Sequence, residues 1–260
     1  MQVVYRFLAT PRWLSYAALT IAAAAVMVML GLWQLDRYHQ RSAINERIEA
    51  GASTSPVPLG QVAEEPRGPA GSVGSAPAKH VEWTRVRLDG RFDPAREILV
   101  RGRTVEGRVG FEVLTPLVLS GGPAVLVDRG WVPAAPGGAL DAPTVPAAPA
   151  GQVTVVGRLR PPESRGGKPH DVNGRAEVRR ITPSAIAPTL PYPLFGVYVS
   201  VDEPAAGLVA VPPEKENALQ NGGYVIQWWL FAALALFGFA YLARREAREA
   251  VEAREPVEVA

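Results

Sequence analysis

Cysteine is absent from this sequence of 260 residues, and histidine occurs only at His39, His80 and His170. The lack of cysteine excludes disulfides, thiolate metal sites and thiol catalysis. Copper carriers use Cys, His and Met ligands, and the chain has only three methionines. We therefore expect no resident metal site and no chemistry that depends on a histidine cluster.

A large excess of charge of either sign is also missing. The chain has 27 Lys and Arg residues against 25 Asp and Glu residues, for a net charge of +2. This balance gives no electrostatic basis for binding nucleic acid, so no nucleic-acid partner is expected. Glycine and proline are abundant, at 25 residues each, which predicts long irregular stretches.

Two long stretches lack charge altogether. Residues 13–33 and residues 224–242 contain no Asp, Glu, Lys or Arg. A helix of about 20 residues crosses a hydrocarbon core of about 30 Å, so we expect transmembrane helices over 13–35 and 224–242. The first run ends in LGLWQLDR and has no small-x-small cleavage site, which favours an uncleaved anchor over a signal peptide.

Basic residues flank the two runs unequally. Arg6 and Arg12 precede the first, and four arginines follow the second (Arg244, Arg245, Arg248 and Arg254). By the positive-inside rule, residues 1–12 and the tail 243–260 are expected to be cytoplasmic. This predicts a multi-pass protein of the cell membrane whose central segment is extracytoplasmic and whose tail extends the second helix into solvent.

Glutamine and tryptophan occur together where the first run ends and the second begins. With both termini on one side, Trp33 and Gln34 lie at about the depth of Gln227 and Trp228. Tryptophan at this depth fits an aromatic belt, whereas glutamine in a span seeks an interhelical partner. We consider two alternatives. Gly31, Gln34 and Gln227 pack the two helices together, or they are presented to another membrane protein.

Between the spans, residues 36–79 are predicted as a stalk and a flexible linker, with the stalk helical over Asp36 to Ala50. Residues 51–79 are rich in Gly, Ala, Ser and Pro, which is typical of flexible segments. Residues 80–223 change to a strand pattern, which predicts an extracytoplasmic β domain.

The strand runs of this domain are VEWTRVRLDGRF, EILVRGRTV, FEVLTPLVL, AVLVDRGWV, QVTVVGRLR and GVYVSVDEP. The turn signal Ser-Gly-Gly-Pro at 120–123 predicts a hairpin, and ITPSAIAPTL predicts a short helix capped by Thr182 or Ser184. Strands joined mostly by turns favour an antiparallel barrel or sandwich. The predicted fold class is therefore membrane-anchored α+β, with two transmembrane helices flanking a mainly antiparallel β barrel or sandwich.

Three soluble motifs are candidates for chemistry. GRTVEGRVG, at 102–110, lacks the strand–turn–helix context of a phosphate loop and is interpreted as a hairpin turn. KPHDVNG, at 168–174, offers one His and one carboxylate, and is interpreted as a polar surface turn. No nucleophile–base pair or carboxylate pair is recognisable, which argues against a membrane enzyme.

The third motif, VDRGWVP, combines charge and an aromatic ring on one strand. Alternation along a strand predicts that Arg129 and Trp131 share one face and that Asp128 takes the other. An arginine beside a tryptophan can clasp a carboxylate, such as a propionate. The alternative is a structural cation–π pair at the sheet edge.

Three motifs in order resemble those of the Surfeit locus protein 1 family. LGLWQLDR resembles its Gly-x-Trp-Gln-x-x-Arg signature, VLVDRGWVP its central strand, and YVIQWW its Tyr-Ala-x-Gln/Thr-Trp motif. The matching positions are Gly31, Trp33, Gln34, Arg37, Arg129, Gly130, Trp131, Tyr224, Gln227 and Trp228. The order of the two spans around one extracytoplasmic domain also matches.

The resemblance implies an assembly factor for haem-copper cytochrome c oxidase, without catalytic turnover, that assists insertion or retention of haem a in the catalytic subunit. It implies the catalytic subunit, other assembly factors and membrane lipid as partners, and haem a as a transient cofactor. On this resemblance Arg129 and Trp131 are candidate cofactor contacts. The membrane motifs, with Gly31, Arg37 and Tyr224 among them, would face the client.

The chain departs from the family pattern at one position. Many members carry a histidine shortly before the tyrosine of the last motif, where this chain has Asn221. His39, two residues after Arg37, is a candidate substitute ligand. Two other functions are alternatives to an assembly factor. One is a haem a-binding carrier, which transfers the cofactor itself, and the other is an accessory subunit of the mature oxidase.

Overall fold

A computed structural model describes residues 5–136, 138, 143–213 and 215–252. The chain divides into two compact units. The first joins Met1–Asn45 with Lys215–Ala260, and the second is Glu46–Glu214. The end of the predicted cytoplasmic tail, residues 253–260, lies outside the described residues.

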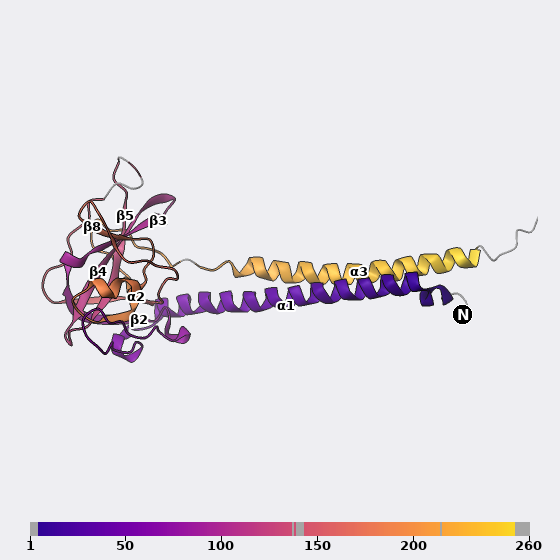
Figure 1. Cartoon of the computed structure of the whole chain (residues 1–260), viewed down its shortest axis with the longest axis horizontal. Coiled ribbons are helices and arrows are strands. Elements are labelled where there is room, and N and C mark those ends of the chain that lie inside the picture. The colour runs from indigo at the N-terminus through magenta and orange to yellow at the C-terminus, as the bar shows by residue number, and fades with distance from the viewer. Residues whose placement is uncertain (1–4, 137, 139–142, 214, 253–260) are drawn as a thin grey trace, which may run out of the picture. The chain divides into compact units, whose positions relative to one another are not determined.

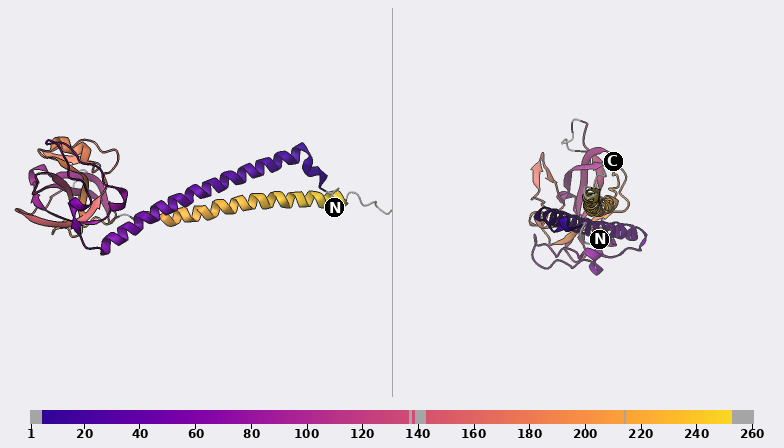
Figure 2. Two further views of the ribbon diagram at one scale, coloured as in Figure 1. Left: turned by 90° about the horizontal axis from the view of Figure 1, so that it is seen from below. Right: turned by 90° about the vertical axis from the view of Figure 1, so that its right-hand side faces the viewer.

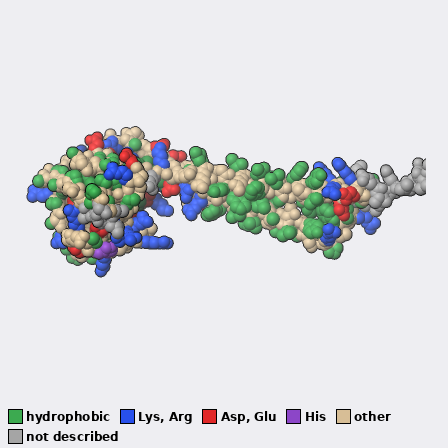
Figure 3. Space-filling model, turned by 90° about the horizontal axis from the view of Figure 1, so that it is seen from above, with side chains coloured by type: hydrophobic (Ala, Val, Ile, Leu, Met, Phe, Trp, Pro, Cys, Tyr) green, Lys and Arg blue, Asp and Glu red, His purple; other side chains and the backbone are tan. Residues whose placement is uncertain are grey.

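The first unit is a pair of long helices, α1 (Pro11–Ser53), whose last residues from Glu46 on belong to the second unit, and α3 (Ala218–Glu252), with the short 3₁₀ helix η1 (Arg6–Ala9) before them. Both long helices are apolar and long enough to cross a membrane. They run side by side in Figures 1 and 2. Hydrophobic side chains cover the middle of the pair in Figure 3, with charged side chains towards its ends. The stalk predicted from Asp36 to Ala50 is helical, because α1 continues unbroken through it.

The second unit is built on β strands. In the described residues the strands are β1 (Val57–Pro58), β2 (Arg85–Phe92), β3 (Ile98–Val105), β4 (Arg108–Leu119), β5 (Ala124–Pro133), β6 (Val153–Arg160), β7 (His170–Val172), β8 (Arg175–Val178) and β9 (Leu194–Val201). They pair in the order β1-β2-β6-β9-β5-β4-β3-β8-β7, and a further pairing joins β2 to β4. That pairing closes β2, β6, β9, β5 and β4 into a barrel. The prediction of two apolar terminal helices around a β domain is confirmed, and the domain is a barrel.

Most neighbouring strands are antiparallel, as predicted, but the pairs β1–β2, β3–β8 and β5–β9 are parallel. The hairpins β3–β4 and β4–β5 form at the turns that the sequence predicts. The short helix α2 (Pro183–Ile186) begins after Thr182. The motif KPHDVNG, interpreted from the sequence as a polar surface turn, contains strand β7 and the turn of the β7–β8 hairpin, and the two strands were not predicted. Its turn is Asn173–Gly174, and both residues have positive φ, as a two-residue hairpin turn of type I′ requires.

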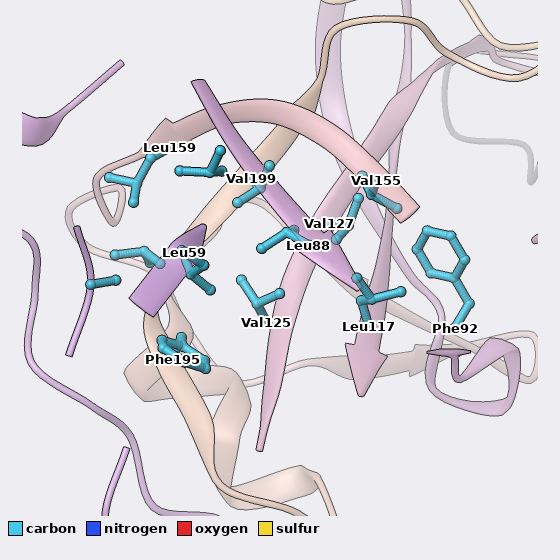
Figure 4. Packing of buried hydrophobic residues seen from close by; sticks show 13 residues of the cluster. Leu59, Leu88, Phe92, Leu117, Val125, Val127, Val155, Leu159, Phe195 and Val199 are labelled. Carbon is cyan, nitrogen blue, oxygen red and sulfur yellow. The ribbon is translucent and has the colours of Figure 1, made fainter. Parts of the chain in front are cut away.

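The barrel interior holds the main apolar cluster, drawn in Figure 4. The interior-facing residues of β2, β4, β5, β6 and β9 alternate with outward ones, and they include Leu88, Leu117, Val127, Leu159 and Val199. A second cluster packs the opposite faces of β4, β5 and β9 against α2, through Leu114, Leu126 and Ile186. Both faces of these strands are therefore buried, which explains their near-continuous apolar sequence.

Residues 51–79, expected as a flexible linker, lie along the barrel. Leu59 and Ala63 are buried in the interior cluster. Farther along, Leu194 N donates to Ser72 O at 2.9 Å, and Gly74 N donates to Leu194 O at 2.8 Å. A Cβ on Gly196 would overlap the carbonyl groups of Gly74 and Ser75. The segment is held by backbone hydrogen bonds and buried side chains, which its Gly- and Pro-rich composition does not reveal.

Candidate functional site

A β-bulge shapes the motif VDRGWVP on β5. β4 pairs Glu112 with Trp131 and Leu114 with Asp128, so two residues of β5, Arg129 and Gly130, lie opposite one residue of β4. Gly130 has φ +125°, and a Cβ there would lie 2.9 Å from the carbonyl oxygen of Val209. Glycine is therefore required at this bulge, because the backbone conformation and the close approach both exclude a side chain.

The bulge separates Arg129 from Trp131. Residues paired across a ladder point to the same side, so Trp131 shares the face of Glu112, Leu114 and Asp128. Arg129 lies on the opposite face. The prediction that Arg129 and Trp131 share one face is wrong, because the extra residue of the bulge reverses the alternation between them.

Arg129 lies at one end of the barrel and is only 3% exposed. Its Nη1 donates to Glu97 Oε2 at 3.0 Å, and its Nη2 donates to the carbonyl oxygens of Pro146 and Ala147, both at 2.9 Å. The guanidinium carbon lies 5.8 Å from the centre of the Phe92 ring. Burial lowers the pKa of Arg129 and, acting on its partner, raises the pKa of Glu97.

A cavity of about 510 Å³ opens beside Arg129. Its walls include Phe92, Val155 and Val201 together with Arg85 and Asp202. Arg85 already pairs with Asp202, Nε to Oδ2 at 2.7 Å. A carboxylate entering this cavity would have to compete with Glu97 and Asp202 for the two guanidinium groups. Arg129, which the sequence suggested could bind an outside carboxylate, is therefore already bonded to groups of the chain itself.

The opposite face of β5 carries a buried charge network that the sequence did not predict. Arg103 on β3 pairs with Glu112 (Nε–Oε2, 3.1 Å) and with Glu163 (Nη2–Oε2, 2.7 Å). Trp131 Nε1 donates to the carbonyl oxygen of Arg103 at 3.0 Å. Trp131 is thus fixed by the network as part of the barrel wall.

Two carboxyl groups of this network are almost fully buried, Glu112 at 7% and Asp128 at 2% exposure. Asp128 accepts hydrogen bonds from Gly130 N and from Ser200 Oγ, both at 3.1 Å. Burial, reinforced by Asp128, raises the pKa of Glu112 to about 8. Burial raises the pKa of Asp128 as well. Their spacing in the sequence gives no hint of this pair, because β4 and β5 bring them together.

The helix pair positions the membrane motifs. A Cβ on Gly31 would overlap the Trp229 indole, so glycine allows the close approach of α1 and α3 there. Gln34 Oε1 accepts a hydrogen bond from Asn221 Nδ2 at 2.7 Å, and Asn221 Oδ1 accepts one from Arg41 Nη1 at 3.0 Å. The interhelical contact of Gln34 is therefore with Asn221.

Other motif residues lie on the outer surface of the helix pair. Trp33 is 53% exposed, and the Arg37 guanidinium lies 5.7 Å from the centre of its ring. Gln227 is exposed, and Tyr224 is 39% exposed. Trp228 is half-buried and meets Phe231 edge to face. Of the three residues considered for helix packing, the structure brings Gly31 and Gln34 to the contact and leaves Gln227 outside it.

His39 is exposed on α1, with its ring centre 5.6 Å from that of Tyr38. Among the described residues, no group of three His, Cys, Asp or Glu side chains is arranged to hold a metal ion. Asn221, at the place of the family's histidine, is engaged by Gln34 and Arg41. In the described part of the chain, Asn221 brings no imidazole to that place, and the imidazole of His39 lies on an open surface of α1.

Fold and site together define a class of protein in which two apolar terminal helices flank a β barrel with a bulged, arginine-bearing strand. The chain belongs to the SURF1 family, whose profile matches residues 21–233. It is 34% identical to an uncharacterised SURF1-like protein of Mycobacterium tuberculosis over 248 residues, covering 93% of this chain and 87% of that protein.

More distant relatives match as well. A SURF1-like protein of Monosiga brevicollis is 28% identical over 248 residues, covering 86% of each chain. Surfeit locus protein 1 of Xenopus tropicalis is 28% identical over 152 residues, covering 52% of this chain and 45% of that protein. The resemblance found in the three motifs is confirmed at the level of the family.

Proposed function

We propose that this protein is an assembly factor for haem-copper cytochrome c oxidase, assisting the insertion or retention of haem a in the catalytic subunit. The observation that carries the proposal is membership of the SURF1 family across residues 21–233. The catalytic subunit and other assembly factors are the partners in this proposal. The protein acts by binding and holding, without catalytic turnover. Glu112 and Asp128 are almost fully buried in the barrel wall, so in this proposal their carboxyl groups have a structural role.

The proposal places the protein in the cell membrane, with both termini cytoplasmic and the barrel on the far side. The two apolar helices support insertion, and the arginines outside them support the orientation. In this arrangement the exposed motif residues Trp33, Arg37, Tyr224 and Gln227 form a surface at the outer membrane interface. We propose that this surface meets the client subunit.

Contact with haem a is transient in this proposal. His39 is its candidate on the helix pair, because the imidazole is exposed. Arg129 and Trp131 act through the barrel wall that they stabilise, since both are buried and hydrogen-bonded within the chain. The haem would supply the redox centre of the client subunit. The residues of this chain would only position the client subunit near the haem.

The test is a reduced-minus-oxidised difference spectrum of membranes from a strain that lacks this protein. A lost or shifted haem a band, restored by the gene, is the expected result. An unchanged band with normal oxidase activity would overturn the proposal. Retention of the protein at one copy per mature oxidase would instead identify an accessory subunit, and a haem band on the purified protein that is lost on His39→Ala would identify a carrier.

A further inference from the structure

A groove runs between α1 and α3 towards the ends that carry both termini. Its volume is about 780 Å³, within the roughly 300–1,000 Å³ of small-molecule sites. In Figure 2 the two helices separate towards this end. Apart from the charged residues at its terminal end, the long side chains in its walls are apolar or aromatic, and they include Trp13, Leu19, Leu234 and Leu242.

Small residues make the hollow. Ala23 on α1 and Ala235 and Gly238 on α3 line it. Among the described atoms, a Cβ on Gly238 would meet nothing within 4 Å. The Trp13 and Phe239 rings meet edge to face, with their centres 5.7 Å apart, and connect the two walls. The groove is therefore an open apolar channel that the two helices do not fill themselves.

The terminal end of the groove is charged with both signs. Arg12 and Arg245 line it together with Glu246 and Glu249. Arg12 Nε donates to the hydroxyl oxygen of Tyr16 at 3.1 Å, and Arg245 Nε donates to Glu249 Oε1 at 2.8 Å. The Arg245 and Glu249 side chains are 65% and 55% exposed, so both stay accessible to a further charged group.

This arrangement fits a molecule with a long apolar chain and a head of both signs. A phosphate group accepts hydrogen bonds from arginine. A primary ammonium group donates to carboxylates. A purely anionic head would meet Glu246 and Glu249 as like charges, and a choline head offers no N–H donor to them. The charges of the groove therefore favour an aminophospholipid.

We propose that the groove between α1 and α3 binds one phosphatidylethanolamine-type lipid. Its acyl chain lies along Leu19, Ala23 and Gly238. Its phosphate is held by Arg12 and Arg245, and its ammonium by Glu246 and Glu249. The site depends on insertion of the helices into a membrane and does not depend on the role in oxidase assembly.

The test uses the full chain purified in detergent and native mass spectrometry. The protein is offered phosphatidylethanolamine, phosphatidylglycerol and phosphatidylcholine with identical acyl chains at equal concentration. We expect one phosphatidylethanolamine per chain to be retained about tenfold over each competitor, since one charge-assisted hydrogen bond contributes about that factor. Equal retention of the three lipids, or preference for phosphatidylglycerol, would overturn the proposal. Occupation of the groove by a protein segment in place of lipid would also overturn the proposal.

Two sets of substitutions test binding of the lipid's acyl chain and binding of its head group separately. Gly238→Leu fills the hollow and is expected to abolish retention of all three lipids, whereas Gly223→Leu, at another open position of α3 outside the groove, leaves it unchanged. Glu246→Gln with Glu249→Gln is expected to lower the preference over phosphatidylcholine about tenfold. Helicity measured by circular dichroism verifies that each variant folds. Full lipid retention in folded Gly238→Leu would show that the acyl chain lies elsewhere.

Discussion

The guanidinium of Arg129 illustrates how a single residue can resemble a ligand site in sequence and act as a structural tie in the fold. Arg129 joins β5 to Glu97 and to the backbone at Pro146 and Ala147. These contacts connect the end of the barrel to two segments that do not pair with β5 in the sheet. The arginine in VDRGWVP therefore contributes to the stability of the barrel end.

For Arg129→Ala we expect the barrel to lose about 3 kcal/mol of stability, because the variant leaves Glu97 half-buried without its cation. Haem a in membranes should fall in parallel, through loss of folded protein. Thermal unfolding of the full chain in detergent measures the first, and the difference spectrum measures the second. Arg91→Ala, an exposed arginine on β2, is the matched control. An unfolding temperature equal to that of the unchanged protein would contradict the structural role.

Glu112 predicts how stability depends on pH. Burial raises its pKa to about 8, so between its ordinary pKa and that value the folded state holds a proton that the unfolded state has released. The stability contributed by this group is present at low pH and is lost as the pH rises through about 8. Asp128 acts in the same direction, because burial raises its pKa too.

We therefore expect the unfolding temperature of the full chain to fall between about pH 5 and pH 9. Glu112→Gln should make that decline shallower, since a neutral amide replaces the titrating group. Glu106→Gln, on the exposed β3–β4 turn, serves as the control and should leave the slope as it is. A steeper decline in Glu112→Gln would contradict the assignment of the proton to this carboxyl.

At the scale of elements, α1 and α3 are held in register by two different devices. Gly31 lets the Trp229 indole approach the α1 backbone. Asn221 accepts from Arg41 and donates to Gln34, so one amide side chain uses both its polar ends across the helix contact. Hydrogen bonds of this kind between spans contribute about 0.6–2 kcal/mol each.

The absence of cysteine makes this register directly testable by crosslinking. Gln34→Cys combined with Asn221→Cys should form a disulfide on mild oxidation in membranes, because the two side chains contact each other. Gln34→Cys combined with Gln227→Cys should not, since Gln227 is exposed away from that contact. A disulfide in the second pair alone would show a different register of α1 against α3. Gel mobility under non-reducing conditions gives the readout.

Sequence patterns predicted individual elements better than their contacts. A run of about 20 residues without charged side chains is a local signal, and it predicted both long helices. The bulge on β5 escaped prediction because Gly130 is the one local sign of it in VDRGWV. The β7–β8 hairpin carried an Asn-Gly turn signal, but its strands are only three and four residues long.

For the whole molecule, the sequence left barrel and sandwich open, because the difference lies in one pairing of distant segments. β2 pairs with β4 only through Gly90, Arg91 and Phe92, and no local sequence pattern predicts this pairing. Glu112 and Asp128 likewise lie on different strands, β4 and β5, and no local sequence pattern predicts that their carboxyl groups interact. The candidate site on the barrel was thus found as a motif, while its buried charges required the fold.

The position of β9 between β5 and β6 has a consequence for synthesis. β5 leaves the ribosome roughly 70 residues before β9 does, which at about 5–20 residues per second takes about 4–14 s. Until β9 is made, one edge of β5 and, once it has been synthesised, one edge of β6 have no partner, because β9 is the strand that pairs with both. The first long helix is complete by then, and the nascent barrel still has two unpaired strand edges, which are sites of aggregation.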